Sequence, residues 1–289
     1  MKKFKITVPA TTSNMGPGFD FLGMSLTLYN TYLFEESKSF EFVGFESIDD
    51  NMTYQTYLLF IGRHSNEEHP VKITLLRNEV PSSRGLGSSA TAVVAGMRAA
   101  NYILGDIVSE EEMIKEMIDF EGHPDNILAA YYGGMVSSVY DNNKLLKFKH
   151  EVSDKLKFSL VIPNYSVKTK DARSILPKSL KYSDVLYNAS RAFILEKAYK
   201  DGDIETLRIA SKDAIHEKYR STLIKDYNLV KSLEEKYNVI VNISGSGSTM
   251  LVISNNYDFT NDIKNLGVVP VHVDKMGMVL EGVLWISLY

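Results

Sequence analysis

A glycine- and serine-rich loop interrupts the first half of the chain, at Pro81-Ser82-Ser83-Arg84-Gly85-Leu86-Gly87-Ser88-Ser89-Ala90. It follows an apolar run and leads into a predicted helix of small residues, 88–104. Backbone N–H groups of such a loop can surround a phosphate group and place it at the N-terminus of the following helix. The loop lacks the Gly-Lys-Ser/Thr ending of a P-loop, so a nucleotide would have to be bound by a different loop geometry.

The same loop fits two other interpretations. Residues 85–90 fit the dinucleotide-binding pattern Gly-x-Gly-x-x-Ala, and an acidic residue, Asp106, lies at roughly the expected distance. Asp106 directly follows the predicted helix, however, with no second strand to carry it, and the loop does not open a βαβ unit. A plain tight turn before a buried helix needs no ligand, but the ten-residue pattern is much more specific than a single glycine triplet.

The composition is that of an ordinary globular protein. The 289 residues are 44% hydrophobic and 24% charged, enough for one large or two ordinary domains. The absence of cysteine excludes disulfides, thiolate metal sites and cysteine nucleophiles. The net charge is −4 and basic residues are spread along the chain, which argues against nucleic acid as a partner. No apolar run is long enough for a membrane helix and none follows the basic start, so we expect a cytoplasmic protein without a membrane partner.

The pattern of apolar residues predicts an α+β protein with antiparallel sheet. Helices are expected at 52–61, 88–104, 109–121 and 125–132, with two or three more at 183–236. Strands are expected at 4–8, within 22–45, and at 71–76, 158–162, 239–243, 250–253, 268–273 and 283–288. Pro9 should end the first strand, and residues 11–18 should form a loop. The polar stretch 144–157 is the candidate boundary between two domains, residues 1–150 and residues 151–289.

Three stretches of the chain together resemble the GHMP small-molecule kinases, the superfamily of galactokinase, homoserine kinase, mevalonate kinase and phosphomevalonate kinase. The loop at 81–90 resembles the central signature of this superfamily. The N-terminal motif, in the form typical of homoserine kinases, resembles Pro9-Ala10-Thr11-Thr12-Ser13-Asn14-Met15-Gly16-Pro17-Gly18-Phe19-Asp20-Phe21-Leu22-Gly23. The C-terminal motif resembles Ile243-Ser244-Gly245-Ser246-Gly247-Ser248-Thr249. The resemblance implies a two-domain GHMP kinase fold, with an N-terminal α/β domain like domain 2 of ribosomal protein S5 and a C-terminal ferredoxin-like α+β sandwich.

For the nucleotide, the resemblance implies that ATP is bound at Ser82, Ser83, Arg84, Gly85, Leu86, Gly87, Ser88, Ser89, Ala90 and Thr91, with Asn78 beside the base. A serine hydroxyl and a lone carboxylate suit Mg²⁺, which retains waters and shares phosphate oxygens. The pair that the resemblance implies is Ser89 with Glu121. Glu116 is the alternative carboxylate, and a solvated helix end is the interpretation of Glu121 without a metal. Residues 244–249 either help to shape the nucleotide loop or form only a flexible hairpin turn.

For the acceptor, the resemblance implies an amino acid bound by Asn14, Asp20, His123, Arg173 and Arg220. Asp20 would accept a hydrogen bond from the ammonium group, and the two arginines would bind the carboxylate with their planar guanidinium groups. An Asx-turn at Asn14 and solvated surface arginines are the alternatives without a ligand. The histidine at position 216 is expected to be structural.

The catalytic residues that the resemblance implies are Asn126, Thr169 and Arg220, close to the reacting hydroxyl. Asn126 stands where many superfamily members carry an aspartate that takes the hydroxyl proton, and an amide cannot be that base. Asp125 is expected to point elsewhere, because neighbours at a helix start point in different directions. With no evident base, the proton would pass to the phosphate itself.

The implied activity is ATP-dependent phosphorylation of the side-chain hydroxyl of L-homoserine, a step of threonine biosynthesis. The alternatives are another GHMP kinase, acting on mevalonate, a phosphorylated precursor or a sugar, and a non-catalytic regulator with this fold. Residues 11–18 contain no Lys, Arg, His or Glu, which disfavours a sugar kinase. The intact phosphate loop disfavours a regulator. The resemblance leaves a homodimer open.

Overall fold

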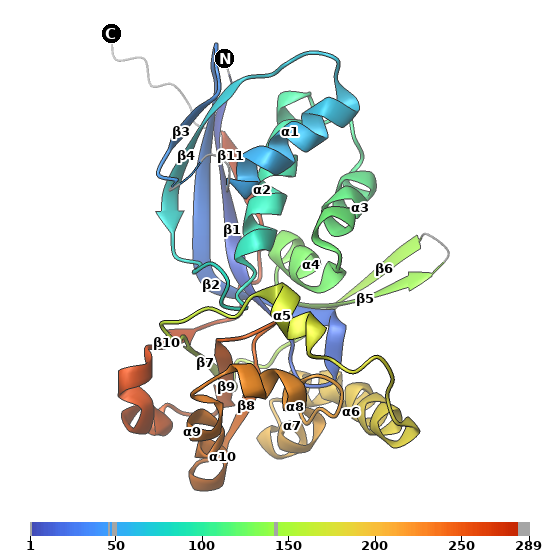
Figure 1. Cartoon of the computed structure of the whole chain (residues 1–289), viewed down its shortest axis with the longest axis vertical. Coiled ribbons are helices and arrows are strands. Elements are labelled where there is room, and N and C mark those ends of the chain that lie inside the picture. Colours follow the sequence, from blue (N-terminus) through green and yellow to red (C-terminus); the bar gives the residue numbers. More distant parts are fainter. Residues whose placement is uncertain (1, 46, 48–50, 142–143, 283–289) are drawn as a thin grey trace.

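The computed structural model describes residues 2–45, 47, 51–141 and 144–282, and its strands form two sheets (Figure 1). The strands are β1 (Lys3–Asn14), β2 (Gly18–Glu36), β3 (Glu41–Val43), β4 (Val71–Asn78), β5 (Met135–Asp141), β6 (Lys144–His150), β7 (Lys157–Val161), β8 (Val239–Ile243), β9 (Met250–Ser254), β10 (Val268–Val271) and β11 (Val279–Gly282). The α-helices are α1 (Met52–His64), α2 (Ser88–Ile103), α3 (Glu110–Glu121), α4 (Pro124–Tyr132), α5 (Thr169–Ser174), α6 (Tyr182–Asp201), α7 (Ile204–Ala210), α8 (Glu217–Arg220), α9 (Tyr227–Lys231) and α10 (Leu233–Lys236). Two 3₁₀ segments are η1 (Ser221–Leu223) and η2 (Asp258–Leu266). The predicted α+β class is confirmed.

The first sheet has the strand order β11-β1-β2-β4-β3, and β5 extends it by pairing with both β2 and β6. Its pairs are antiparallel except β3 with β4. The helices α1 to α4 lie on one face of this sheet (Figure 1). Apolar side chains from strands and helices meet there in one core, which includes Phe34, Ile73, Val93 and Met117. The predicted helices at 52–61 and 88–104 are both part of this layer.

The second sheet has the order β10-β7-β9-β8 and is antiparallel throughout. Successive residues of a strand face opposite sides, so Ile240 belongs to one core and Val241 to another. The core around Ile240 also contains Ala10 and Met15 from the first sheet and its turn. The N-terminal motif is therefore packed against the second half of the chain.

The structure differs from the sequence prediction at the N-terminal motif. β1 does not end at Pro9 but continues to Asn14, so the predicted strand end is wrong. The predicted loop at 11–18 is wrong for residues 11–14 and 18, and only residues 15–17 form a turn. The register with β2 shifts between Pro9 and Ala10, and a bulge is a place where a strand tolerates proline. Within 22–45, the predicted polar breaks are wrong as far as Glu36, because β2 runs unbroken over 19 residues.

The predicted boundary region also contains regular structure. β6 lies inside the polar stretch 144–157 and pairs with β5 in a hairpin that projects from the body (Figure 1). β11, near the end of the chain, returns to the first sheet beside β1. The division at residue 150 stays a prediction, and the predicted strand at 283–288 lies outside the described residues. Among the described helices, none is long and apolar enough to cross a membrane.

Candidate active site

A cavity of about 970 Å³ opens where the first sheet, its helices and the second half of the chain meet. This volume is typical of small-molecule sites. Much of its wall comes from three segments. They are the end of β1 with the start of β2 (13–14 and 20), the end of β4 through the first turn of α2 (78–89), and the end of α3 through the start of α4 (121, 123 and 125–126). The second half of the chain contributes Thr169, Arg173, Arg220, Gly245 and Ser246.

The loop between β4 and α2 is shaped by two glycines. Gly85 and Gly87 have φ angles of +71° and +68°, a region that side chains with a Cβ rarely adopt. A Cβ on Gly85 would lie 2.1 Å from the carbonyl oxygen of Ser244, and one on Gly87 would lie 2.0 Å from Thr11 Oγ1. The loop therefore rests directly on the other two motifs, and all three meet at the cavity.

The first turn of α2 faces an anion-binding position. The helix starts at Ser88 with Gly87 as its N-cap, and no side chain caps it. Its first N–H groups are thus available to a phosphate group, and the helix dipole favours negative charge there. Asn78 and the predicted nucleotide residues 82–89 all line the cavity.

Three predicted nucleotide residues are engaged within the protein. Ala90 and Thr91 are fully buried behind the cavity wall and do not line it. The hydroxyl of Thr91 donates to a backbone carbonyl of its own helix at 2.8 Å. The guanidinium of Arg84 lines the cavity but donates, at 2.9, 3.1 and 3.2 Å, to the carbonyl oxygens of Ser82, Pro163 and Asn164. Arg84 therefore fastens the loop to the segment after β7.

The predicted magnesium pair lies together. Ser89 Oγ donates to Glu121 Oε2 at 2.6 Å. Burial raises the pKa of Glu121 despite this hydrogen bond. A cation bound beside the group would oppose this shift and favour the charged carboxylate. A hydroxyl and a carboxylate beside a phosphate position fit Mg²⁺. The alternative, Glu116, lies outside the cavity lining and contacts Arg63 and His64 at 2.9 and 2.6 Å. In the described part of the chain, no group of three or more His, Cys, Asp or Glu forms a metal cluster.

The turn between β1 and β2 is held by Asn14. Its Oδ1 accepts from the backbone N–H of Asp20, and its Nδ2 donates to the carbonyl of Gly245, both at 3.0 Å. Asn14 and Asp20 have positive φ angles of 72° and 62°, a conformation that costs energy and is often found at functional sites. Asn14 thus uses its amide to shape the turn, and the turn presents Asp20 to the cavity.

One carboxylate and two guanidinium groups gather beside this turn. Arg173 donates to both carboxylate oxygens of Asp20, at 2.8 and 2.9 Å. Arg220 is 2% exposed, and burial, with the charge of Arg173, lowers its pKa to about 10. It therefore remains a cation at neutral pH. The two guanidinium carbons lie 5.9 and 5.0 Å from the ring centre of Phe19.

The expectation that Asp125 points elsewhere is wrong. Asp125 lines the cavity, and its Oδ1 accepts from His123 Nδ1 at 2.6 Å and from the backbone N–H of Asn126 at 2.8 Å. His123 has an extended backbone as the N-cap of α4, which lets residues on both sides of the helix start face the same cavity. Burial disfavours the charged imidazole, but the charges of Asp125 and Glu121 outweigh it and raise the pKa of His123.

The amide of Asn126 is fixed by two residues that the sequence did not single out. Its Oδ1 accepts from Thr11 Oγ1 at 2.7 Å, and its Nδ2 donates to Ser13 Oγ at 3.2 Å. The available signal was their spacing of two, which places both side chains on one face of a strand. It was lost because the segment was predicted to be a loop. Thr169, at the start of α5, lines the same cavity.

Comparison with known proteins identifies the class to which this fold and site belong. Residues 51–134 match the family model for the GHMP kinases N terminal domain, so the class is that of the GHMP kinases. The homoserine kinases of Clostridium novyi and Clostridium beijerinckii are 40% and 39% identical to the chain over 274 and 266 residues; each alignment covers 90% of this chain, and 90% and 89% of those proteins. The crystal structure of homoserine kinase from Cytophaga hutchinsonii superposes with a TM-score of 0.82 at 25% identity, covering 97% of this chain and 98% of that one. The chain belongs to the homoserine kinase family.

Proposed function

We propose that this protein transfers the γ-phosphoryl group of ATP to the side-chain hydroxyl of L-homoserine, giving O-phosphohomoserine and ADP for threonine biosynthesis. Family membership supports the proposal. The observation that carries it is the cluster of Asp20, Arg173 and Arg220 in the same cavity as the phosphate loop. This cluster complements the ammonium and carboxylate groups of an amino acid. Mevalonate has no ammonium group, and a neutral sugar has neither charge.

The residues of the chain would act mainly by positioning both substrates. N–H groups of the loop and of α2 hold the triphosphate. Arg220 and Arg173 bind the homoserine carboxylate, and Asp20 turns from Arg173 to the ammonium group. Asn126 and Thr169 orient the acceptor hydroxyl. Fixing both reactants makes the attack effectively intramolecular, which can contribute roughly 7–11 kcal/mol.

The hydroxyl oxygen forms a bond to the γ-phosphorus, and the bond from that phosphorus to the β-phosphate bridge breaks. Asn126 cannot accept the hydroxyl proton, so in this proposal the proton passes to an oxygen of the transferred phosphoryl group. Ser89 and Glu121 would hold Mg²⁺, which supplies neutralisation of phosphate charge when bound. A single-turnover pH profile with an enzyme pKa near neutrality, lost in His123→Ala, would contradict this route for the proton.

The test of the activity is ADP release with homoserine against a panel of small alcohols that includes serine, mevalonate and galactose. Turnover restricted to homoserine, with phosphohomoserine identified by mass, supports the proposal. Turnover of another alcohol instead would assign the chain to a different acceptor. Loss of turnover in Ser89→Ala separates the kinase from a non-catalytic regulator.

We also propose that the protein is located in the cytoplasm and forms a homodimer. Two side chains of α6 support an interface, because Tyr182 is 78% and Phe193 is 88% exposed, and exposed apolar patches mark contact surfaces. Light scattering of the purified protein measures the assembly directly. A monomer at all concentrations would remove the homodimer and leave the proposed activity standing.

A further inference from the structure

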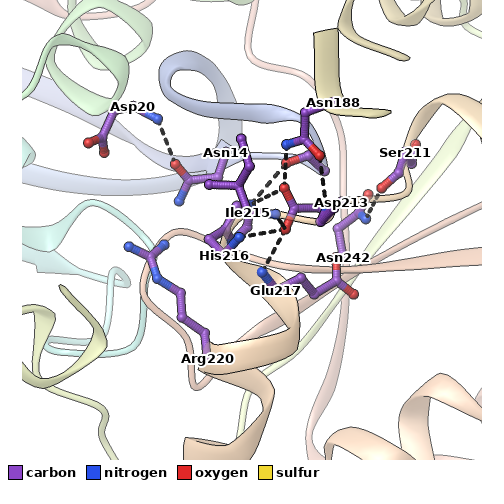
Figure 2. A network of polar contacts seen from close by, with 12 residues as sticks. Asn14, Asp20, Asn188, Ser211, Asp213, Ile215, His216, Glu217, Arg220 and Asn242 are labelled. Atoms are coloured by element: carbon purple, nitrogen blue, oxygen red, sulfur yellow. Dashed lines mark hydrogen bonds and ion pairs between the residues drawn. The ribbon is translucent and has the colours of Figure 1, made fainter. Parts of the chain in front are cut away.

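Asp213, between α7 and α8, is a buried carboxylate within a network of polar contacts (Figure 2). It does not line the cavity. Its Oδ2 accepts from the backbone N–H groups of residues 215, 216 and 217 at 3.0, 2.7 and 2.7 Å. Its Oδ1 accepts from Asn188 Nδ2 at 2.7 Å. A charged group is buried at little cost only when several donors satisfy it. This carboxylate therefore fixes the backbone of the segment that follows it.

That segment supports the turn that carries Asp20. His216 Nε2 donates to the carbonyl of Gly16 at 2.9 Å, and its ring stacks on Phe19 with 5.3 Å between ring centres. A Cβ on Gly16 would lie 2.3 Å from the carbonyl oxygen of Ser211. The turn is thus seated directly on residues 211–216.

The same segment also places Arg220. The backbone N–H of Arg220 donates to the carbonyl of His216 at 3.0 Å, and its guanidinium reaches the carbonyl of Gly245 at 2.7 Å. Gly245 is also the acceptor for Asn14 Nδ2. Figure 2 shows the side chains of Asn14 and Arg220 on the side of the network nearest Asp20. One short segment therefore sets where Arg220 stands relative to the turn.

We propose that Asp213 is a positioning residue for the amino-acid half of the site: it fixes the backbone of residues 215–217, so that His216 holds the turn before Asp20 and α8 places Arg220 beside it. This inference rests on the proposed function and names a residue outside the cavity that supports it. None of the hydrogen bonds that Asp213 makes within the described chain reaches the phosphate loop. Removal of its charge should therefore raise the KM for homoserine and leave the KM for ATP nearly unchanged.

Asn188 makes a sharp test available. Its Oδ1 accepts from the backbone N–H of Ala214 at 2.8 Å while its Nδ2 donates to Asp213. In Asp213→Asn, the new NH₂ group faces the NH₂ group of Asn188; if the Asn188 amide turns over to accept from it, the N–H of Ala214 loses its acceptor. In Asn188→Asp, two buried carboxylates face each other. The double variant N188D/D213N restores one donor and one acceptor in the reverse direction. This exchange keeps the volume of both side chains.

We expect Asp213→Asn to raise the KM for homoserine about tenfold, as the loss of one hydrogen bond to a charged group does. The KM for ATP should stay within about twofold, because no hydrogen bond of Asp213 reaches the phosphate loop. Hydrogen exchange of the peptide that contains residues 14–20 should become faster. The double variant should restore both values. Asp203→Asn is the matched control, because Asp203 caps α7 through the N–H groups of Glu205 and Thr206 and does not line the cavity.

A second pair of variants covers the case in which Asp213→Asn does not fold. His216→Leu removes the donor to Gly16 and should raise the KM for homoserine, whereas His216→Gln keeps a donor and should not. A wild-type protein inactive with homoserine would overturn the proposed function. An active wild type whose Asp213→Asn variant keeps its homoserine KM and its exchange rate, or loses affinity for both substrates equally, would overturn the positioning role alone.

Discussion

The phosphate end and the amino-acid end of the cavity are built in different ways. Most of the phosphate end comes from one continuous stretch, residues 78–89, from the end of β4 to the first turn of α2, and α3 adds Glu121. The amino-acid end combines Asp20 from the start of β2, Arg173 from α5 and Arg220 at the end of α8. Local backbone rules shape the first, whereas the second depends on how distant segments pack. Substitutions should therefore affect the two ends separately.

The largest effect is expected for Arg220→Lys. Arg220 donates to two backbone carbonyls, of Ala172 and Gly245, while buried, and an ammonium group cannot reproduce that planar geometry. We expect kcat/KM for homoserine to fall about 100-fold, since each hydrogen bond of a charged group contributes about 1.5–3 kcal/mol. ATP-analogue affinity, measured by calorimetry, should change by less than about twofold.

The matched control for this variant is Arg208→Lys. Arg208 also donates to a backbone carbonyl, that of Glu234, but it does not line the cavity. Its kinetic constants should be those of the wild type. An equal loss of ATP and homoserine affinity in Arg220→Lys would show that the two ends are not independent.

The next effect tests the phosphate end. Gly87→Ala would place a Cβ 2.0 Å from Thr11 Oγ1 at a φ angle of +68°. Strain of this kind costs about 1–3 kcal/mol, so the KM for ATP should rise about 30-fold if the loop relaxes. Steady-state kinetics with each substrate varied in turn measures the effect.

Gly62→Ala provides the comparison, because a Cβ there, in the last turn of α1, meets nothing within 4 Å. It should leave both KM values unchanged and raise stability slightly, since alanine is the better helix former. If Gly87→Ala changed the homoserine KM as much as the ATP KM, the loop would be part of both ends.

The same contrast explains what the sequence could predict. The spacing of Gly85, Gly87 and the following serines is a local signal, and the loop and helix were predicted from it. The direction of Asp125 depends on the extended backbone of His123, and the path of β1 depends on its pairing with β2 across a bulge. The prediction for Asp125 failed because the direction of its side chain depends on the backbone before the helix. The prediction for β1 failed because pairing with β2 outweighed the local preference of proline.

The residues that contact the site residues were even harder to predict from the sequence. Arg173 and Asp20 lie 153 positions apart in the sequence, and only the family resemblance joined them before the fold was known. The role of Asp213 has no signal in a single sequence, because the sequence does not distinguish a buried aspartate from an exposed one. Its hydrogen-bond partners are backbone N–H groups and one amide, and the imidazole of His216 lies 3.8 Å from its Oδ1.

A smaller effect concerns the magnesium pair, which joins the loop to α3. Glu121→Gln removes the carboxylate beside Ser89 while keeping a hydrogen-bond acceptor. The Mg²⁺ concentration for half-maximal activity should rise about tenfold, as it does when a single group of a metal site is altered. Titration of activity with Mg²⁺ at saturating substrates measures it. Glu116→Gln, which alters the carboxylate outside the cavity, should leave the requirement unchanged, and the reverse result would transfer the role to Glu116.

The smallest effect is a pH dependence of stability at the amino-acid end. Burial lowers the pKa of His216 in the folded protein, whereas the unfolded value is about 6.5. Between these two values the unfolded chain binds a proton that the folded chain does not, so stability is complete above about pH 6.5 and falls as the pH drops below it.

One such group contributes a slope that approaches about 1.4 kcal/mol per pH unit. His216→Gln does not titrate, so its free energy of unfolding should lack this component, and the two proteins should diverge only on the acid side. Urea unfolding between about pH 5 and 8 measures both curves. Parallel curves would mean that His216 is not the buried neutral donor to Gly16. The turn at the amino-acid end would then be held by the hydrogen bonds of Asn14 and the packing of Gly16, without a contribution from the imidazole.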